Sequence, residues 1–216
     1  KNYLNMIRKL FTFIVLFIGC TFSVMSQNSL SYRGFSGGMM IHSGYLKTQN
    51  FNLISNSNQH FNTIKAQGFP FGLGGAGRVH LGSFLRIGGE GYVSDLKYGE
   101  NGSNISVSWG GVLVDVAWQN KYFTPFAGIT LGGGRWQNIT LTNEVKDDFI
   151  AEENVGYRTN SFFALSPFIG VEYALSNKIR LTLKADYLIN LNNSPNDFAK
   201  GVRLFFGFMF YRLKTE

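Results

Sequence analysis

The sequence contains little cysteine, histidine or proline. Cys20 is the single cysteine among 216 residues, so the chain cannot close an internal disulfide. The three histidines, His42, His60 and His80, are too widely spaced for a zinc-ligand pattern, and we expect neither a metal nor another cofactor. Only 4 prolines accompany 26 glycines and 21 phenylalanines, which is unusual for a soluble α/β protein. Curved strands relieved by glycine and flanked by aromatic belts would produce this composition.

Long apolar runs are missing after the first 26 residues, so any membrane span must consist of strands. A strong charge of one sign is missing as well. The formal net charge is +7, and it falls to +4 if Lys1, Arg8 and Lys9 leave with a cleaved leader. Because no basic run accompanies this small surplus, the sequence gives no case for a nucleic-acid partner.

The amino terminus has the pattern of a secretory signal peptide. Arg8 and Lys9 precede an apolar segment, residues 10–19, that is too short to cross a bilayer. Val24 and Ser26 then place small residues at the −3 and −1 positions of a cleavage site.

We therefore predict a signal peptide at residues 1–26 and one outer-membrane β-barrel domain at residues 27–216. Two alternatives stay open. The leader could be retained as a membrane anchor, or Cys20 could be lipidated, although the residues before it form a poor lipoprotein box.

Segments with the two-residue alternation of β-strands fill the rest of the chain. The clearest is Ile179 to Tyr187, where apolar residues alternate with Arg180, Thr182, Lys184 and Asp186. The pattern predicts an all-β fold, an eight-stranded antiparallel up-and-down transmembrane β-barrel. Its strands are expected at residues 32–46, 68–81, 84–96, 104–118, 122–136, 161–175, 178–189 and 200–213.

The connections between these strands alternate between short and long. Short turns at residues 82–83, 119–121 and 176–177 contain the asparagine and glycine that tight hairpins need. Outer-membrane barrels have short periplasmic turns and longer extracellular loops. We therefore place the protein in the outer membrane of a Gram-negative bacterium, with extracellular loops at residues 47–67, 97–103, 138–160 and 190–198.

Charged residues recur in phase within several of the predicted strands. Charges of both signs can be buried in a narrow barrel if they pair, and eight strands enclose a space that side chains fill. We predict a plugged lumen with a charge network of Arg78, Arg86, Glu90, Asp115, Glu172, Arg180, Lys184 and Asp186.

The lipid-facing parity of the first and fourth strands is left open by the sequence. In the fourth, Ile105 and Val107 alternate in one phase, whereas the apolar residues from Val112 to Trp118 alternate in the other. A bulge near Gly110-Gly111 would reconcile the two phases and would point Asp115 inward.

Three segments resemble the eight-stranded outer-membrane barrel families that include the OmpA transmembrane domain and OmpX. They are residues 36–45 (SGGMMIHSGY), 85–92 (LRIGGEGY) and 204–211 (LFFGFMFY). The resemblance extends over the mature chain and implies an architecture rather than an activity. Many members end on an aromatic residue, whereas residues 212–216 follow Tyr211 here.

Enzyme chemistry has little support in these residues. The barrel enzymes that modify lipid A would be resembled only if a histidine, a serine and an acidic residue converged. His42 and Ser43 are neighbours in a strand, so their side chains point to opposite faces. We expect no enzyme and no catalytic residue.

The expected function is that of a structural or interaction scaffold, and the alternative is a small-molecule or lipid-handling barrel. Expected partners are outer-membrane lipid and lipopolysaccharide, whose phosphates Arg33, Arg135 and Arg158 could contact, and a protein held by the loops. Packing of the loops on themselves would explain their aromatic residues equally well. The candidate anchors for a partner are Phe51, Phe61, Glu152, Glu153 and Tyr157.

Overall fold

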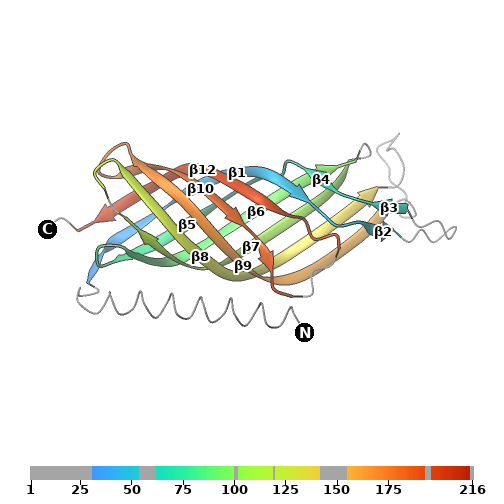
Figure 1. Ribbon diagram of the computed structural model, residues 1–216, viewed down its shortest axis with the longest axis horizontal. Coiled ribbons are helices and arrows are strands. Elements are labelled where there is room, and N and C mark those ends of the chain that lie inside the picture. Colours follow the sequence, from blue (N-terminus) through green and yellow to red (C-terminus); the bar gives the residue numbers. More distant parts are fainter. Residues whose placement is uncertain are drawn as a thin grey trace, which may run out of the picture. The chain divides into compact units, whose positions relative to one another are not determined.

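Eight long antiparallel strands form a closed ring in the computed structural model, which describes residues 31–53, 62–99, 102–118, 120–141, 155–192 and 196–214. β12 pairs with both β10 and β1, so the sheet closes on itself (Figure 1). The eight-stranded antiparallel fold predicted from the sequence is confirmed. The strands are β1 Tyr32–Lys47, β5 Phe71–Leu81, β6 Leu85–Tyr98, β7 Ser103–Ala117, β8 Phe123–Leu141, β9 Val155–Ala174, β10 Ile179–Tyr187 and β12 Lys200–Leu213.

Four short strands lie in the connections at the loop end of the ring. β2 Phe51–Leu53 pairs with β3 Asn62–Ile64 within the first loop. β4 Gln67–Gly68 pairs with β1, and β11 Ile189–Asn190 pairs with β9. None of the described residues belongs to a helix long and apolar enough to cross a membrane.

β8 and β9 extend further toward the loop end than the sequence predicts. Their register is unbroken out to Leu141 paired with Val155, so Tyr157, which we assigned to the third loop, lies in β9 instead. The inward side chains of this extension, Asn138 and Thr140, are polar and buried, and the outward Gln137 interrupts the apolar face, so the hydrophobic alternation is weak there. The hydroxyl of Tyr98 bonds inward to Asn138 and Thr140 of β8, at 2.7 and 2.6 Å.

β7 contains no bulge among its residues, contrary to prediction. Its register with β6 and with β8 is continuous through Gly110 and Gly111. Ile105 and Val107 face inward, whereas Val112 and Val114 face outward, because the lumen is apolar near the loop end and charged near the turn end. The face that is apolar changes along the strand, although the backbone phase does not. Asp115 points inward, as the sequence predicts.

The outer surface of the ring is a belt of exposed apolar side chains. Exposed aromatic residues lie toward both ends of the barrel. They include Phe35, Trp118, Tyr122 and Phe123 at the short-turn end and Tyr45, Phe69, Phe71 and Tyr157 at the loop end. A soluble barrel would bury its apolar face and expose its charges, and this one does the reverse. The middle of the belt includes Met39, Ile41, Ile87, Val93, Val112, Val114, Ile129, Leu131, Ile169, Leu183, Leu204 and Phe206.

Candidate functional site

Charged side chains meet in the half of the lumen nearer the short turns. Arg86 of β6 donates to Asp115 of β7 (Nη2 to Oδ2, 3.1 Å) and to Glu172 of β9 (Nη1 to Oε1, 3.0 Å). Arg78 of β5 forms an ion pair with the same aspartate (Nε to Oδ2, 2.9 Å) without hydrogen-bond geometry. Tyr211 of β12 donates to Glu172 and accepts from Arg86. Five strands are therefore joined through two carboxylates.

A second cluster centres on Lys184 of β10 and Glu90 of β6. The ammonium Nζ lies 2.8 Å from Oε2 of the carboxylate. Hydroxyls of Tyr92 and Thr130 donate to the same carboxylate, at 2.9 and 2.7 Å. The carboxylate thus has three donors, which offset the loss of water on burial.

A third cluster, built on Arg203 and Asp186, lies next to the second cluster on the side of the loop end. Arg203 of β12 donates to Asp186 of β10 (Nη2 to Oδ2, 2.7 Å), and Ser166 of β9 donates to the same carboxylate (3.0 Å). Lys184 Nζ lies 4.0 Å from this carboxylate and so connects the second cluster to the third.

The buried charges balance. Apart from Asp197 near the loop end, which pairs with the exposed Arg158 (3.3 Å), four cations and four anions are less than a tenth exposed, and each lies within 4.0 Å of an opposite charge. The structure places seven of the eight predicted network residues in this set. The eighth, Arg180, is partly buried and donates to Thr124 at the turn end. The set is Arg78, Arg86, Lys184, Arg203, Glu90, Asp115, Glu172 and Asp186.

Arg203 was missed by the sequence analysis. A usable signal existed, because Val202, Leu204 and Phe206 alternate as the outward face of β12, and Arg203 lies on the opposite parity.

Apolar side chains close the lumen toward the loops. Phe51 of β2 and Phe198, at the end of the fourth loop, are 8% and 1% exposed and belong to the main buried cluster. The backbone N–H of Gln49 donates to the backbone carbonyl of Asn196 (2.9 Å) and so connects the first loop to the fourth. Phe51 is therefore part of the packed interior, which leaves little of its side chain exposed for the partner contact that the sequence predicts. The alternative of loop self-packing holds for this residue.

The remaining predicted anchors are placed as follows. Tyr157 is 60% exposed on β9 and accepts a hydrogen bond from Gln137 (3.2 Å). Phe61, Glu152 and Glu153 lie outside the described residues, as does the predicted signal peptide.

The two histidines that the structure describes, His42 and His80, form hydrogen-bond contacts with other residues of the barrel. His42 faces the lumen, with Nε2 3.3 Å from the carbonyl of Val93, whereas the hydroxyl of Ser43 bonds outward to the carbonyl of Pro70. His80 lies 2.9 Å from the hydroxyl of Ser36. Within the described ranges, no group of three or more His, Cys, Asp or Glu side chains could hold a metal ion.

The apolar outer belt, the closed ring of eight strands and the buried charges together define a class of protein. The chain is a transmembrane β-barrel of the kind found in the outer membrane of Gram-negative bacteria.

No protein-family model matches the sequence, and no curated protein matches it significantly. The barrel is similar to solved structures of Gram-negative outer-membrane proteins. Neisserial surface protein A has 14% identity and a TM-score of 0.49, and OprG from Pseudomonas aeruginosa has 10% and 0.49, each over 86% of this chain and 99% of the other. Ail, the attachment invasion locus protein of Yersinia pestis, was crystallised with the heparin analogue sucrose octasulfate. It has 10% identity and a TM-score of 0.46 over 83% of this chain and 99% of its own.

Proposed function

We propose that the protein is a closed membrane scaffold that meets its partners at its extracellular end rather than through its lumen. The observation that carries this proposal is the filled interior. The eight charges of the lumenal network already have opposite charges beside them, and Phe51 and Phe198 pack above them. An ion entering the lumen would have to break these pairs, which costs several kcal/mol for each uncompensated buried charge.

Reconstitution into planar bilayers tests this directly. We expect no steady conductance at either polarity, because the paired side chains leave no hydrated column for ions. A trimeric porin in the same lipid controls for the recording, and heat-modifiable migration on gels confirms insertion of the folded barrel. Stepwise currents that grow with the amount of inserted protein would contradict a closed scaffold and favour a channel.

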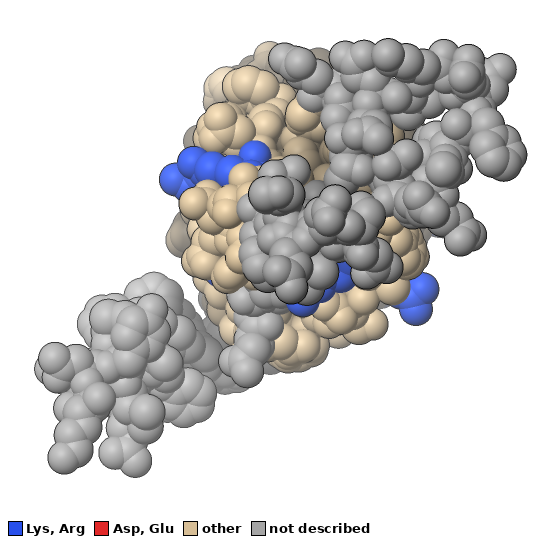
Figure 2. Space-filling model, turned by 90° about the vertical axis from the view of Figure 1, so that its right-hand side faces the viewer, with Lys and Arg blue, Asp and Glu red and all other residues tan. Residues whose placement is uncertain are grey.

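The loop end supplies the surface for partners. Figure 2 looks onto this end and shows lysine and arginine atoms at the edge of the described surface. The exposed cations of the loop end include Lys47, Lys65, Lys97 and Arg158. These exposed cations suit the anionic groups of lipopolysaccharide. The exposed Tyr157 on the extended β8–β9 pair suits a protein contact.

Exchange of the loops tests the protein partner. Residues 54–61 and 142–154 are replaced by glycine-serine linkers, which leaves Phe51 in place. We expect the barrel to fold and stay heat-modifiable, while crosslinked partner recovered from native membranes falls about tenfold or more, as for loss of a binding hot spot. The matched control replaces residues 119–121 in a short turn. Equal recovery from both variants would argue against binding through the loops.

A further inference from the structure

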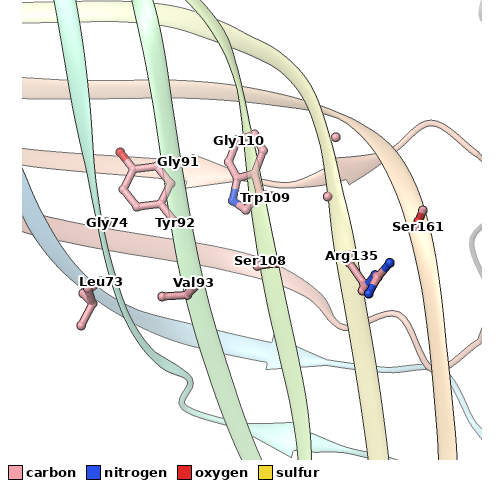
Figure 3. Close-up of a pocket in the computed structure, with 12 residues that line it drawn as sticks. Leu73, Gly74, Gly91, Tyr92, Val93, Ser108, Trp109, Gly110, Arg135 and Ser161 are labelled. Carbon is pink, nitrogen blue, oxygen red and sulfur yellow. The ribbon is translucent and has the colours of Figure 1, made fainter.

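An open groove with a volume of about 650 Å³ crosses the outer wall of the barrel over β5 to β9 (Figure 3). Gly91, Gly110 and Gly133 line it. They stand directly opposite one another in register, and Gly75 continues the row onto β5. These four positions share the outward parity, so the backbone is bare along this line, and the next outward positions toward the loop end all carry side chains. We call this line the glycine row.

One rim of the groove is a second row of residues in register. Figure 3 shows it crossing the strands beside the glycine row. The rim changes character along its length, from apolar on β5 and β6 to polar on β7, β8 and β9. In chain order of the strands it consists of Leu73, Val93, Ser108, Arg135 and Ser161.

This change of character shows where the groove lies in the membrane. Strands of such barrels tilt by about 35–45°, so a row perpendicular to them climbs toward one membrane face. Counted from the short-turn end of each strand, Leu73 is eight residues from Leu81 on β5, whereas Arg135 is twelve residues from Phe123 on β8. The groove therefore begins within the apolar belt and ends at the outer membrane–water interface.

A single charged side chain lies at the interfacial end. Arg135 is exposed, and its side chain has no hydrogen bond or ion pair with another described residue. The residues directly opposite it on both sides, Ser108 and Ser161, carry hydroxyl groups. A guanidinium with neighbouring hydroxyls can bind a phosphate through charge-assisted hydrogen bonds.

The length of the glycine row suits a hydrocarbon chain. Four strands are separated by three spacings of about 4.8 Å, so the glycine row is roughly 14 Å long. One leaflet of the hydrocarbon core is about 15 Å thick. We propose that the groove binds a phosphorylated lipid of the outer leaflet, with an acyl chain on the glycine row and the phosphate at Arg135.

A second copy of the chain fits this surface less well. In a two-fold contact the same wall would face itself. It would bring a second Arg135 rather than an anion, and the charge would stay uncompensated. The lipid supplies both the apolar chain and the negative charge.

Two glycines provide a matched test of binding at the glycine row. A Cβ at Gly91 would lie 3.5 Å from the nearest atom, and one at Gly77 would meet nothing within 4 Å, so both accept a side chain. Gly77 faces outward on β5 but does not line the groove. Gly91→Leu therefore fills the groove, and Gly77→Leu adds the same side chain elsewhere on the wall.

Native mass spectrometry in nonionic detergent measures the binding of dipalmitoyl phosphatidic acid and of dipalmitoylglycerol, which have the same chains with and without phosphate. We expect Gly91→Leu to weaken both by about tenfold, because leucine displaces about two methylene groups of the chain. Gly77→Leu should bind as the parent does. Equal effects of the two glycine variants, or saturable binding of neither lipid by the parent, would overturn the proposal.

The contact between Arg135 and the lipid phosphate is tested independently of the glycine row. Arg135→Gln should weaken the binding of phosphatidic acid by about tenfold and the binding of dipalmitoylglycerol by less than about twofold. Arg212→Gln, at the opposite end of the barrel, should change neither. Excess inorganic phosphate should not displace the lipid, since the chain contributes most of the contact. Unchanged selectivity in Arg135→Gln, displacement by phosphate alone, or a dimer that forms without lipid would overturn it.

Discussion

Lys184→Met is expected to lower the free energy of unfolding by about 3 to 5 kcal/mol, because it leaves a buried carboxylate without its cation. Lys184 is 0% exposed and its ammonium is the only charged group that pairs with Glu90 within 4.0 Å among the described residues. Methionine keeps the length of the side chain and its packing against Phe205, so the loss isolates the charge. Urea titration of the refolded barrel in detergent measures the difference.

The double variant Lys184→Met with Glu90→Leu is the control for this result. Removing both partners removes the unpaired charge, so we expect it to be more stable than Lys184→Met alone. A loss below about 1 kcal/mol in the single variant would mean that water reaches Glu90 and that the lumen is not sealed.

Leu183→Arg is expected to cost about 2 to 4 kcal/mol, although the next residue is a lysine that the fold tolerates. Leu183 is 51% exposed on the outer face of β10, between Val171 of β9 and Phe206 of β12. An arginine there would sit in the middle of the hydrocarbon, whereas Lys184 points into the lumen. The change is measured by the same titration after refolding into phospholipid bicelles.

The matched control is Ile139→Arg, on the outward face of β8 beyond Arg135. This position lies above the apolar belt, so the cost should be about 1 kcal/mol or less. Equal costs at Leu183 and Ile139 would show that the belt has been placed at the wrong height on the barrel.

Strand positions could be predicted because the membrane imposes a strict pattern on them. Every residue of β10 alternates between lipid and lumen, and the sequence of Ile179 to Tyr187 reports this directly. The charge network followed from the same parity, since Arg86, Glu90 and Lys184 have only one face on which they can be paired.

The sequence predictions differ from the structure where the hydrophobic pattern does not follow the strand structure. Beyond Arg135, the inward residues Asn138 and Thr140 of β8 are polar and the outward Gln137 interrupts the apolar face, so the extension lacks the regular apolar alternation of the lower strand. In β7 the interior itself changes from apolar at Ile105 to charged at Asp115, which imitates a bulge. Phe51 looked like a surface anchor because no local pattern reports that a loop folds back over the lumen.

Contacts in the lumen join parts of the chain that are far apart in sequence, and this bears on how the barrel assembles. Arg86 meets Tyr211 across 125 residues, and Lys184 meets Glu90 across 94. None of these contacts can form within a single hairpin. A half-made sheet must keep its charges hydrated, so the departure of water from the interior and the joining of β12 to β1 belong to one late, cooperative event.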